Sequence, residues 1–108
     1  MSGAPTPSES PRPESLPKAV PLRERALAVG ERALGAGHKD VRTSMGELAR
    51  LLEETGDLAR AEALYLRLLA LRETALGAGS TGVARTRERL VALYERQGRL
   101  EDAARYRD

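Results

Sequence analysis

The sequence of 108 residues contains no cysteine, no phenylalanine and no tryptophan, and tyrosine occurs only three times. The absence of cysteine excludes disulfide scaffolds and thiolate metal sites. No apolar run approaches the roughly 20 residues that a membrane-spanning helix needs. The first residues also lack the apolar segment of a secretory signal. We therefore expect a protein that has no membrane span and is located in the cytoplasm.

The residues that remain for a core are mainly leucine and alanine, which occur seventeen times each. Both residues favour helices, whereas the β-branched residues that favour strands are scarce. A chain of this length forms one domain with a modest core. The net charge is only +2, and sixteen of the eighteen basic residues are arginine. The composition therefore predicts an all-α domain with a mixed-sign surface.

All six prolines lie within the first 21 residues, together with four serines. A segment of this composition buries too little apolar surface to offset the entropy lost on ordering. No two prolines are three residues apart, so the P-x-x-P spacing of polyproline ligands is missing. We expect residues 1–20 to form a Pro/Ser-rich extended tail and residues 21–108 to form the helical domain.

The chain repeats itself at an offset of 42 residues. Residues 22–66 match residues 64–108 at 17 of 45 positions. Gly35 and Gly56, for example, recur as Gly77 and Gly98. A fixed period of 20–50 residues is typical of proteins built from stacked repeats.

Each repeat contains two segments with helical periodicity, separated by glycine. Gly56 and Gly98 are expected to end helices in a left-handed conformation. Asp40 is expected to cap one helix, and Ser80 or Thr81 the equivalent helix one repeat later. The predicted helices lie near residues 21–34, 40–55, 57–76, 81–97 and 100–107.

The apolar positions of these helices predict the buried core. They share one face of each helix, where residues three and four apart come together. The expected core residues are Leu48, Leu52, Leu58, Ala61, Tyr65, Leu68, Leu69, Leu90, Leu93 and Tyr94.

Two segments carry a resemblance to a known family: LARLLEETGDLARAEALYLRLLALRETALGAGS (48–80) and LVALYERQGRLEDAARY (90–106). They resemble tetratricopeptide repeats of the 42-residue, kinesin-light-chain-like variety, and the resemblance covers about residues 22–108. It implies a short right-handed solenoid of antiparallel helix pairs with about two and a half repeats. It also implies a protein-binding module, because such repeats act as scaffolds with variable sites.

Features that catalysis would need are few. The single histidine, His38, lies in a glycine-rich linker and is expected to be an exposed loop residue. Glu53 and Glu54 close a polar helix face, which explains the pair without a catalytic role. The linker G-A-G-H-K-D lacks the spacing of a phosphate-binding loop. We expect no enzyme activity, no metal and no cofactor.

By the resemblance, the first helix of each repeat lines a concave groove where peptides lie. The asparagines of peptide-clamping family members are absent here, so charge-paired binding of an acidic peptide and an ordinary solvated face both stay open. The groove residues implied are Thr43, Glu47, Arg50, Glu53, Arg85, Glu88, Arg89 and Glu95.

Both ends of the predicted stack offer uncovered apolar residues, and stacks of this kind usually need about three repeats. Arg87 stands where the preceding repeat places Met45 in the core. We therefore expect a homo-oligomer or a subunit of a hetero-complex, assembled through open ends. The residues expected at these ends are Leu22, Leu27, Arg87 and Tyr106.

Nucleic acid is the least favoured partner. Five arginines crowd the last repeat, but acidic residues alternate with them, and there is no Phe or Trp on which bases could stack. The sequence thus leaves two main functional classes, a groove-using adaptor and an assembly subunit, with a nucleic-acid accessory role as a further alternative.

Overall fold

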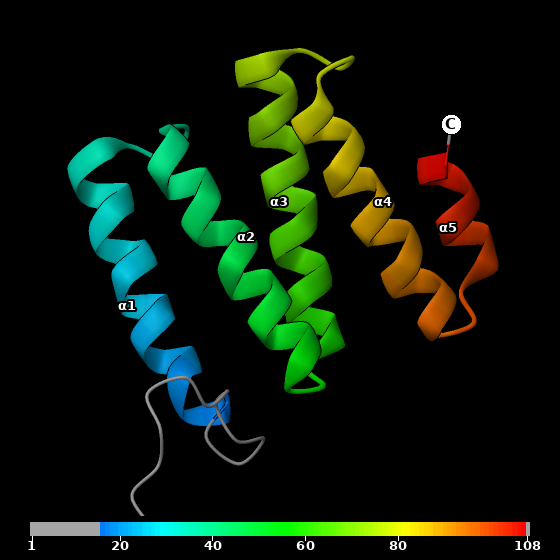
Figure 1. Cartoon of the computed structure of the whole chain (residues 1–108), viewed down its shortest axis with the longest axis horizontal. Coiled ribbons are helices and arrows are strands. Elements are labelled where there is room, and N and C mark those ends of the chain that lie inside the picture. Colours follow the sequence, from blue (N-terminus) through cyan, green and yellow to red (C-terminus); the bar gives the residue numbers. More distant parts are fainter. Residues whose placement is uncertain (1–15, 108) are drawn as a thin grey trace, which may run out of the picture.

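The computed structural model describes residues 16–107, and every regular element in this range is a helix (Figure 1). Four of the helices begin and end within one residue of their predicted limits. The helices are α1 (Leu16–Leu34), α2 (Lys39–Glu54), α3 (Leu58–Leu76), α4 (Thr81–Arg96) and α5 (Leu100–Arg107).

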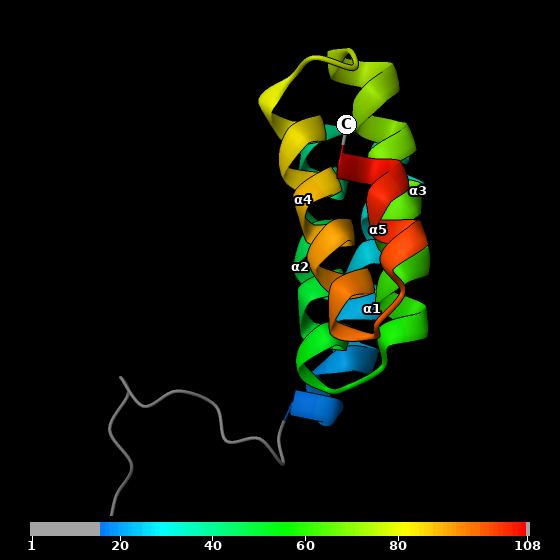
Figure 2. The same ribbon diagram turned by 90° about the vertical axis from the view of Figure 1, so that its right-hand side faces the viewer.

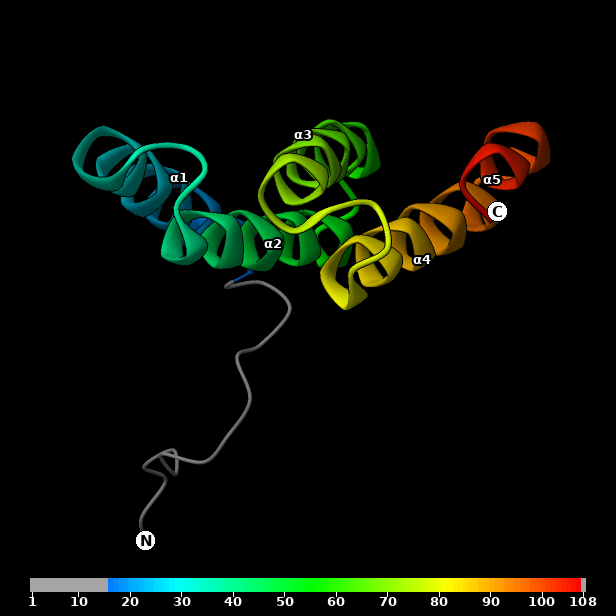
Figure 3. The ribbon, with the colours of Figure 1, turned by 90° about the horizontal axis from the view of Figure 1, so that it is seen from above.

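The helices form two layers that are clear when the molecule is seen from above, with α1, α3 and α5 in one row and α2 and α4 in the other (Figure 3). Seen from the α5 end, the helices run alongside one another (Figure 2). Within residues 16–107, the helix backbones pack closely only against the helices that precede and follow them in sequence. Arginine–glutamate pairs add side-chain contacts between α1 and α3 and between α2 and α4. The prediction of an all-α solenoid of antiparallel helix pairs is confirmed.

The first helix begins at Leu16, five residues before its predicted start, and Pro21 lies inside it. Residues 16–20, which were assigned to the extended tail, are therefore helical. Pro21 has no N–H for the carbonyl of Pro17, which costs one helical hydrogen bond. Val20 is buried in the core with Leu27, seven residues later on the same helix face, and this packing offsets the loss. The rest of the expected tail lies outside the described residues.

One glycine with positive φ stands in each of the four connections. The φ angles of Gly35, Gly56, Gly77 and Gly98 are 90°, 87°, 89° and 72°. Residues with a Cβ rarely adopt this conformation. The roles predicted for Gly56 and Gly98 are confirmed. The glycines are spaced by 21 residues, so each 42-residue repeat consists of two units of one helix and one turn.

The caps of the equivalent helices α2 and α4 are His38 and Ser80. The Nδ1 atom of His38 accepts a hydrogen bond of 3.1 Å from the Asp40 N–H, and the Ser80 Oγ accepts one of 3.2 Å from the Val83 N–H. The prediction that Asp40 caps α2 was wrong. An N-cap needs extended backbone, which His38 has, whereas Asp40 already lies in the first helical turn.

The core follows the predicted helix faces. Nine of the ten predicted residues are buried, and Leu58 is half-buried. Leu27, expected at an open end, is only 7% exposed because it faces α2, and so it belongs to the core. Met45, placed in the core by the repeat alignment, is fully buried. Further buried residues outside the ten predicted are Val20, Val41, Ala49, Val83, Thr86 and Ala103.

Candidate functional site

A groove runs between α2 and α4, with α3 as its floor. The backbones of the two wall helices do not pack against each other, so side chains of α3 line the space between them. The groove contains a pocket of about 220 Å³. This pocket is lined by Thr43, Gly46, Glu47 and Arg50 of α2, Tyr65, Leu68 and Arg72 of α3, and Arg85, Thr86 and Arg89 of α4. We call the part of it formed by Arg50, Arg72, Arg85 and Arg89 the arginine groove.

Arg72 is the most enclosed of these arginines. Its Nη1 donates a hydrogen bond of 2.8 Å to the Thr86 Oγ1, which in turn donates to the carbonyl of Gly82. Burial lowers the pKa of Arg72, and the nearby charges of Arg42 and Arg85 lower it further. The arginine groove therefore concentrates positive charge around a partly desolvated guanidinium.

No carboxylate among residues 16–107 forms an ion pair with the four arginines of the arginine groove. Elsewhere in this part of the chain, arginines pair across helices. Arg67 lies 2.6 Å from Glu31, and Arg60 pairs with Glu24. With respect to residues 16–107, the arginines of the groove are thus available to a further anion.

Two acidic residues on the α2 wall are already engaged. Glu47 lies 3.2 Å from Arg23 of α1. Glu53 accepts a hydrogen bond from the Tyr65 hydroxyl and lies 3.6 Å from Arg96. Burial raises the pKa of Tyr65, and the hydrogen bond to Glu53 raises it further. These carboxylates therefore neutralise the groove arginines only weakly.

The structure brings most of the predicted groove residues together. Thr43, Glu47, Arg50, Arg85 and Arg89 line the first pocket, and a second hollow beside it is lined by Glu53, Arg85, Glu88, Arg89 and Ala92.

Glu95, also predicted for the groove, lies in a different pocket, where Arg107 of α5 pairs with it. The floor residues Tyr65 and Arg72 were missed as groove residues because the prediction considered only the first helix of each repeat. The repeat gave no signal for Arg72, since Gly30 occupies its position 42 residues earlier.

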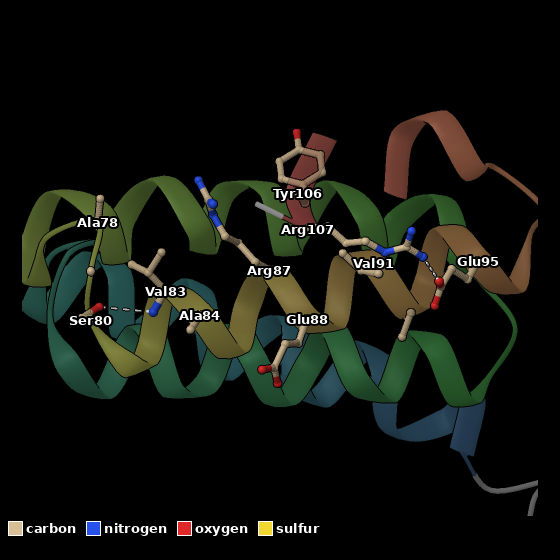
Figure 4. A pocket seen from close by; sticks show the side chains of 12 residues that line it. Ala78, Ser80, Val83, Ala84, Arg87, Glu88, Val91, Glu95, Tyr106 and Arg107 are labelled. Carbon is tan, nitrogen blue, oxygen red and sulfur yellow. Dashed lines mark hydrogen bonds and ion pairs between the residues drawn. The ribbon is translucent and has the colours of Figure 1, made fainter. Parts of the chain in front are cut away.

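A second surface lies at the end of the stack, between α4 and α5 (Figure 4). Its pocket has a volume of about 440 Å³. The helix α5 has 8 residues and α4 has 16, so α5 covers only part of α4. We call this surface the end groove and define it by Val83, Ala84, Arg87 and Val91 of α4 and Tyr106 of α5. Arg87 and Tyr106, both predicted for an open end, lie in it.

A network centred on Glu62 fixes α5 against α3 and α4. Glu62 accepts hydrogen bonds of 3.0 Å from the Tyr94 hydroxyl and 2.6 Å from Arg99. Arg99 also lies over the Tyr94 ring, which stacks on Tyr106 at 5.9 Å. The hydrogen bond from Arg99 lowers the pKa of Glu62. Burial of the Tyr94 hydroxyl, together with its hydrogen bond to Glu62, raises the pKa of Tyr94 to about 12. This network positions the Tyr106 side of the end groove.

The same range of the chain lacks the features of a metal site and of a membrane-spanning segment. Residues 16–107 contain no group of acidic, histidine or cysteine side chains that could hold a metal ion. None of the described helices is long and apolar enough to cross a membrane. A further pocket of about 310 Å³ lies between α1, α2 and α3, where Arg60 and Arg67 are already paired with Glu24 and Glu31.

The comparison with protein families agrees with the geometry. A family model described as tetratricopeptide repeat matches residues 14–74, which is more than half of the chain and includes α1, α2 and nearly all of α3. No curated protein matches the sequence. The 42-residue period is consistent with the kinesin-light-chain-like type of this repeat. With its two layers of antiparallel helices and its repeated glycine turns, the chain belongs to the tetratricopeptide repeat family, whose repeats generally mediate protein–protein interactions.

Proposed function

We propose that this chain is a non-catalytic adaptor that binds an acidic segment of a partner protein in the arginine groove. The observation that carries the proposal is the set of four arginines around one pocket without a carboxylate partner in residues 16–107. Guanidinium groups bind carboxylates through paired, charge-assisted hydrogen bonds. An acidic segment would supply the counter-charges that this part of the chain does not.

Electrostatics favour this occupant over a neutral peptide. Arg72 is partly desolvated beside Arg42 and Arg85, and like charges in a region of low dielectric repel. A bound carboxylate relieves this repulsion and forms new hydrogen bonds. The adjoining hollow contains Glu53 and Glu88 as well as arginines. We therefore expect the partner segment to place its acidic residues near Arg72 and to tolerate a basic residue near Glu88.

The test is a fluorescence anisotropy titration with a labelled peptide of alternating glutamate and alanine, at low and physiological salt. We expect Arg50→Glu and Arg89→Glu to weaken binding at least about tenfold each, because each loses a charge-assisted hydrogen bond of about 1.5–3 kcal/mol. The matched control is Lys18→Glu, which makes the same charge change on an exposed residue of α1.

Three results would contradict the proposal. They are no measurable binding of the acidic peptide, equal losses of affinity for Lys18→Glu and Arg50→Glu, and equal binding of a lysine–alanine peptide. A single-stranded RNA that binds through the same arginines, while the acidic peptide does not bind, would favour the nucleic-acid alternative.

A second candidate function is that of a subunit in a larger assembly. Exposed apolar residues at both ends of the stack favour it, since Leu22 of α1 is 65% exposed and the end groove of α4 is only partly covered. This candidate uses surfaces that the acidic segment does not occupy, so the two functions are compatible.

A further inference from the structure

The outer face of α1 carries an apolar stripe that no other described helix covers. Leu22, Ala26, Val29 and Ala33 recur at intervals of four, three and four residues and are all exposed. The exposed fractions of Leu22 and Val29 are 65% and 64%. Residues at this spacing share one helix face. The stripe has the pattern of a helix–helix contact whose second helix is not among the described elements.

Two basic residues flank this stripe. Arg25 and Arg32 are exposed, lie seven residues apart, and have no carboxylate partner among residues 16–107. Seven residues correspond to about 10 Å along a helix. A helix that docks on the stripe would therefore meet two positive charges about 10 Å apart.

The end groove shows the matching pattern on α4. Ala84 and Val91 are seven residues apart and provide its apolar surface, with the Tyr106 ring at its side (Figure 4). Glu88 and Glu95 flank them, also seven residues apart. Glu88 has no basic partner within the described residues, and Glu95 pairs with the exposed Arg107.

We propose that the stripe of α1 from one copy of this chain docks into the end groove of a second copy, in a head-to-tail arrangement. The apolar pairs Leu22/Val29 and Ala84/Val91 have the same spacing, and the charge pairs Arg25/Arg32 and Glu88/Glu95 have opposite sign and the same spacing. Two helices in contact use such apolar seams with flanking opposite charges to select their partner. One sequence carries both halves of the contact, which identifies the occupant as a second copy.

The proposed contact joins two different surfaces, so it leaves one free stripe and one free groove on every dimer. Such contacts build open chains unless the rotation closes a ring. The molar mass of the protein should therefore rise steadily with concentration and should not stop at that of a dimer. This inference goes beyond the binding of an acidic segment and stands if that binding fails, because none of the four arginines of the arginine groove contributes to it.

The test uses sedimentation velocity on the full chain and on two variants. The stripe variant carries Leu22→Asp and Val29→Asp, and the groove variant carries Ala84→Lys and Glu88→Lys. All four positions are exposed, so both variants should keep the helical circular dichroism of the parent. We expect the parent to associate, each variant alone to be monomeric, and an equimolar mixture of the two variants to form a dimer with one copy of each.

The mixture separates this arrangement from symmetric ones. If stripes paired with stripes or grooves with grooves, one variant would still self-associate and the mixture would form no mixed dimer. Either result would overturn the proposal, as would a parent that stays monomeric up to about 1 mM, the weak end of specific affinity.

A charge exchange tests the register. Arg25→Glu with Arg32→Glu should weaken association about tenfold. Adding Glu88→Arg to the same chain should recover part of it, because one of the two charge pairs then again joins opposite charges, while Glu95 still faces a like charge. No recovery would contradict the proposed pairing. A chain without residues 1–15 provides the last comparison. Association that appears only after this deletion would show that the chain's own first residues occupy the stripe or groove, and would overturn the proposal for the full chain.

Discussion

The layer of α1, α3 and α5 and the groove between α2 and α4 use arginine in different ways. In the layer, Arg60, Arg67 and Arg99 reach carboxylates on a neighbouring helix and help to set the helix spacing. In the groove, Arg72 and Arg85 lie close to each other without such partners in the described residues. A paired arginine contributes to the stability of the stack, whereas an unpaired one keeps its charge available for an external anion. In the proposed function, the same residue type would serve the fold on one face and recognition on the other.

The core lies between the layer of α1, α3 and α5 and the arginine groove and holds both in place. The largest expected loss of stability therefore comes from a substitution in this core. Leu68 is 1% exposed and lies at the floor of the groove. We expect Leu68→Ala to lower the free energy of unfolding by about 2–5 kcal/mol, through lost burial and the cavity left behind. Urea unfolding measures this. The control Leu22→Ala, on an exposed position, should change stability by less than about 0.5 kcal/mol. Equal effects of the two substitutions would show that the packing register is wrong.

In the layer of α1, α3 and α5, where arginines pair with carboxylates, the loss of one carboxylate should lower stability. We expect Glu62→Gln to lower the free energy of unfolding by about 1–3 kcal/mol at pH 7, because Arg99 and Tyr94 lose a charged acceptor. The control is Glu54→Gln, an exposed residue that forms no ion pair in residues 16–107 and should have little effect.

The difference in unfolding free energy between the parent and Glu62→Gln should change with pH in one direction. The pKa of Glu62 is lowered in the folded state by Arg99. Its stabilisation is therefore fully present above the unfolded pKa of about 4.3 and is lost as the pH falls through the lower folded pKa. The gap between the parent and Glu62→Gln should shrink between pH 5 and acid conditions in urea titrations at about six pH values. A gap that widens on acidification would contradict the assigned network.

A glycine in the groove wall should separate stability from binding. A Cβ at Gly46 would lie 3.5 Å from the Leu68 Cδ2, which is an ordinary contact. We expect Gly46→Ala to stabilise α2 by about 1 kcal/mol and to weaken acidic-peptide binding, because the methyl group narrows the pocket. Gly56→Ala is the matched control with opposite sign, since its φ of 87° strains any residue with a Cβ. Thermal melts measure the opposite changes in stability of the two variants, and fluorescence anisotropy measures the affinity of Gly46→Ala for the acidic peptide.

The smallest expected effect on stability comes from a substitution in the arginine groove. Arg85→Gln should change the free energy of unfolding by no more than about 0.5 kcal/mol, and in the stabilising direction, because it removes repulsion from Arg72. Added sodium chloride should raise the melting temperature of the parent more than that of the variant, since salt screens the repulsion. Destabilisation comparable to that of Glu62→Gln would show that the two faces do not differ as described.

The helices and their ends could be predicted from sequence because their determinants are local. Gly56 and Gly98 mark turns by their conformational freedom, and apolar spacing marks the buried faces. The start of α1 could not be predicted, because the burial of Val20 overrides the local effect of Pro21. His38 was missed as a cap for a related reason, since the cap is identified by backbone angles that the sequence does not show.

The groove was predicted in outline only. Its walls followed from the family resemblance, but its floor depends on how α3 presents Arg72 between two helices whose backbones do not pack against each other. Arg72 was missed as a groove residue, whereas Glu95 was predicted as one and lies elsewhere. It lies on a predicted wall helix, yet Arg107, twelve residues later, binds it on the side of the end groove. Contacts between helices decide both cases.

The contacts between sequence neighbours described for residues 16–107 also bear on how this chain folds. Every helix–helix interface closes only a short connection, so the loop-closure entropy of each folding step is small, and low contact order corresponds to folding in microseconds to milliseconds. The contacts between helices two apart in sequence are ion pairs of side chains, such as Arg67 with Glu31, and are weaker than the packing of consecutive helices. We therefore expect the helices to open one at a time from either end. Amide hydrogen exchange should be slowest in α2, α3 and α4, which each pack against a helix on both sides, and faster in α1 and α5.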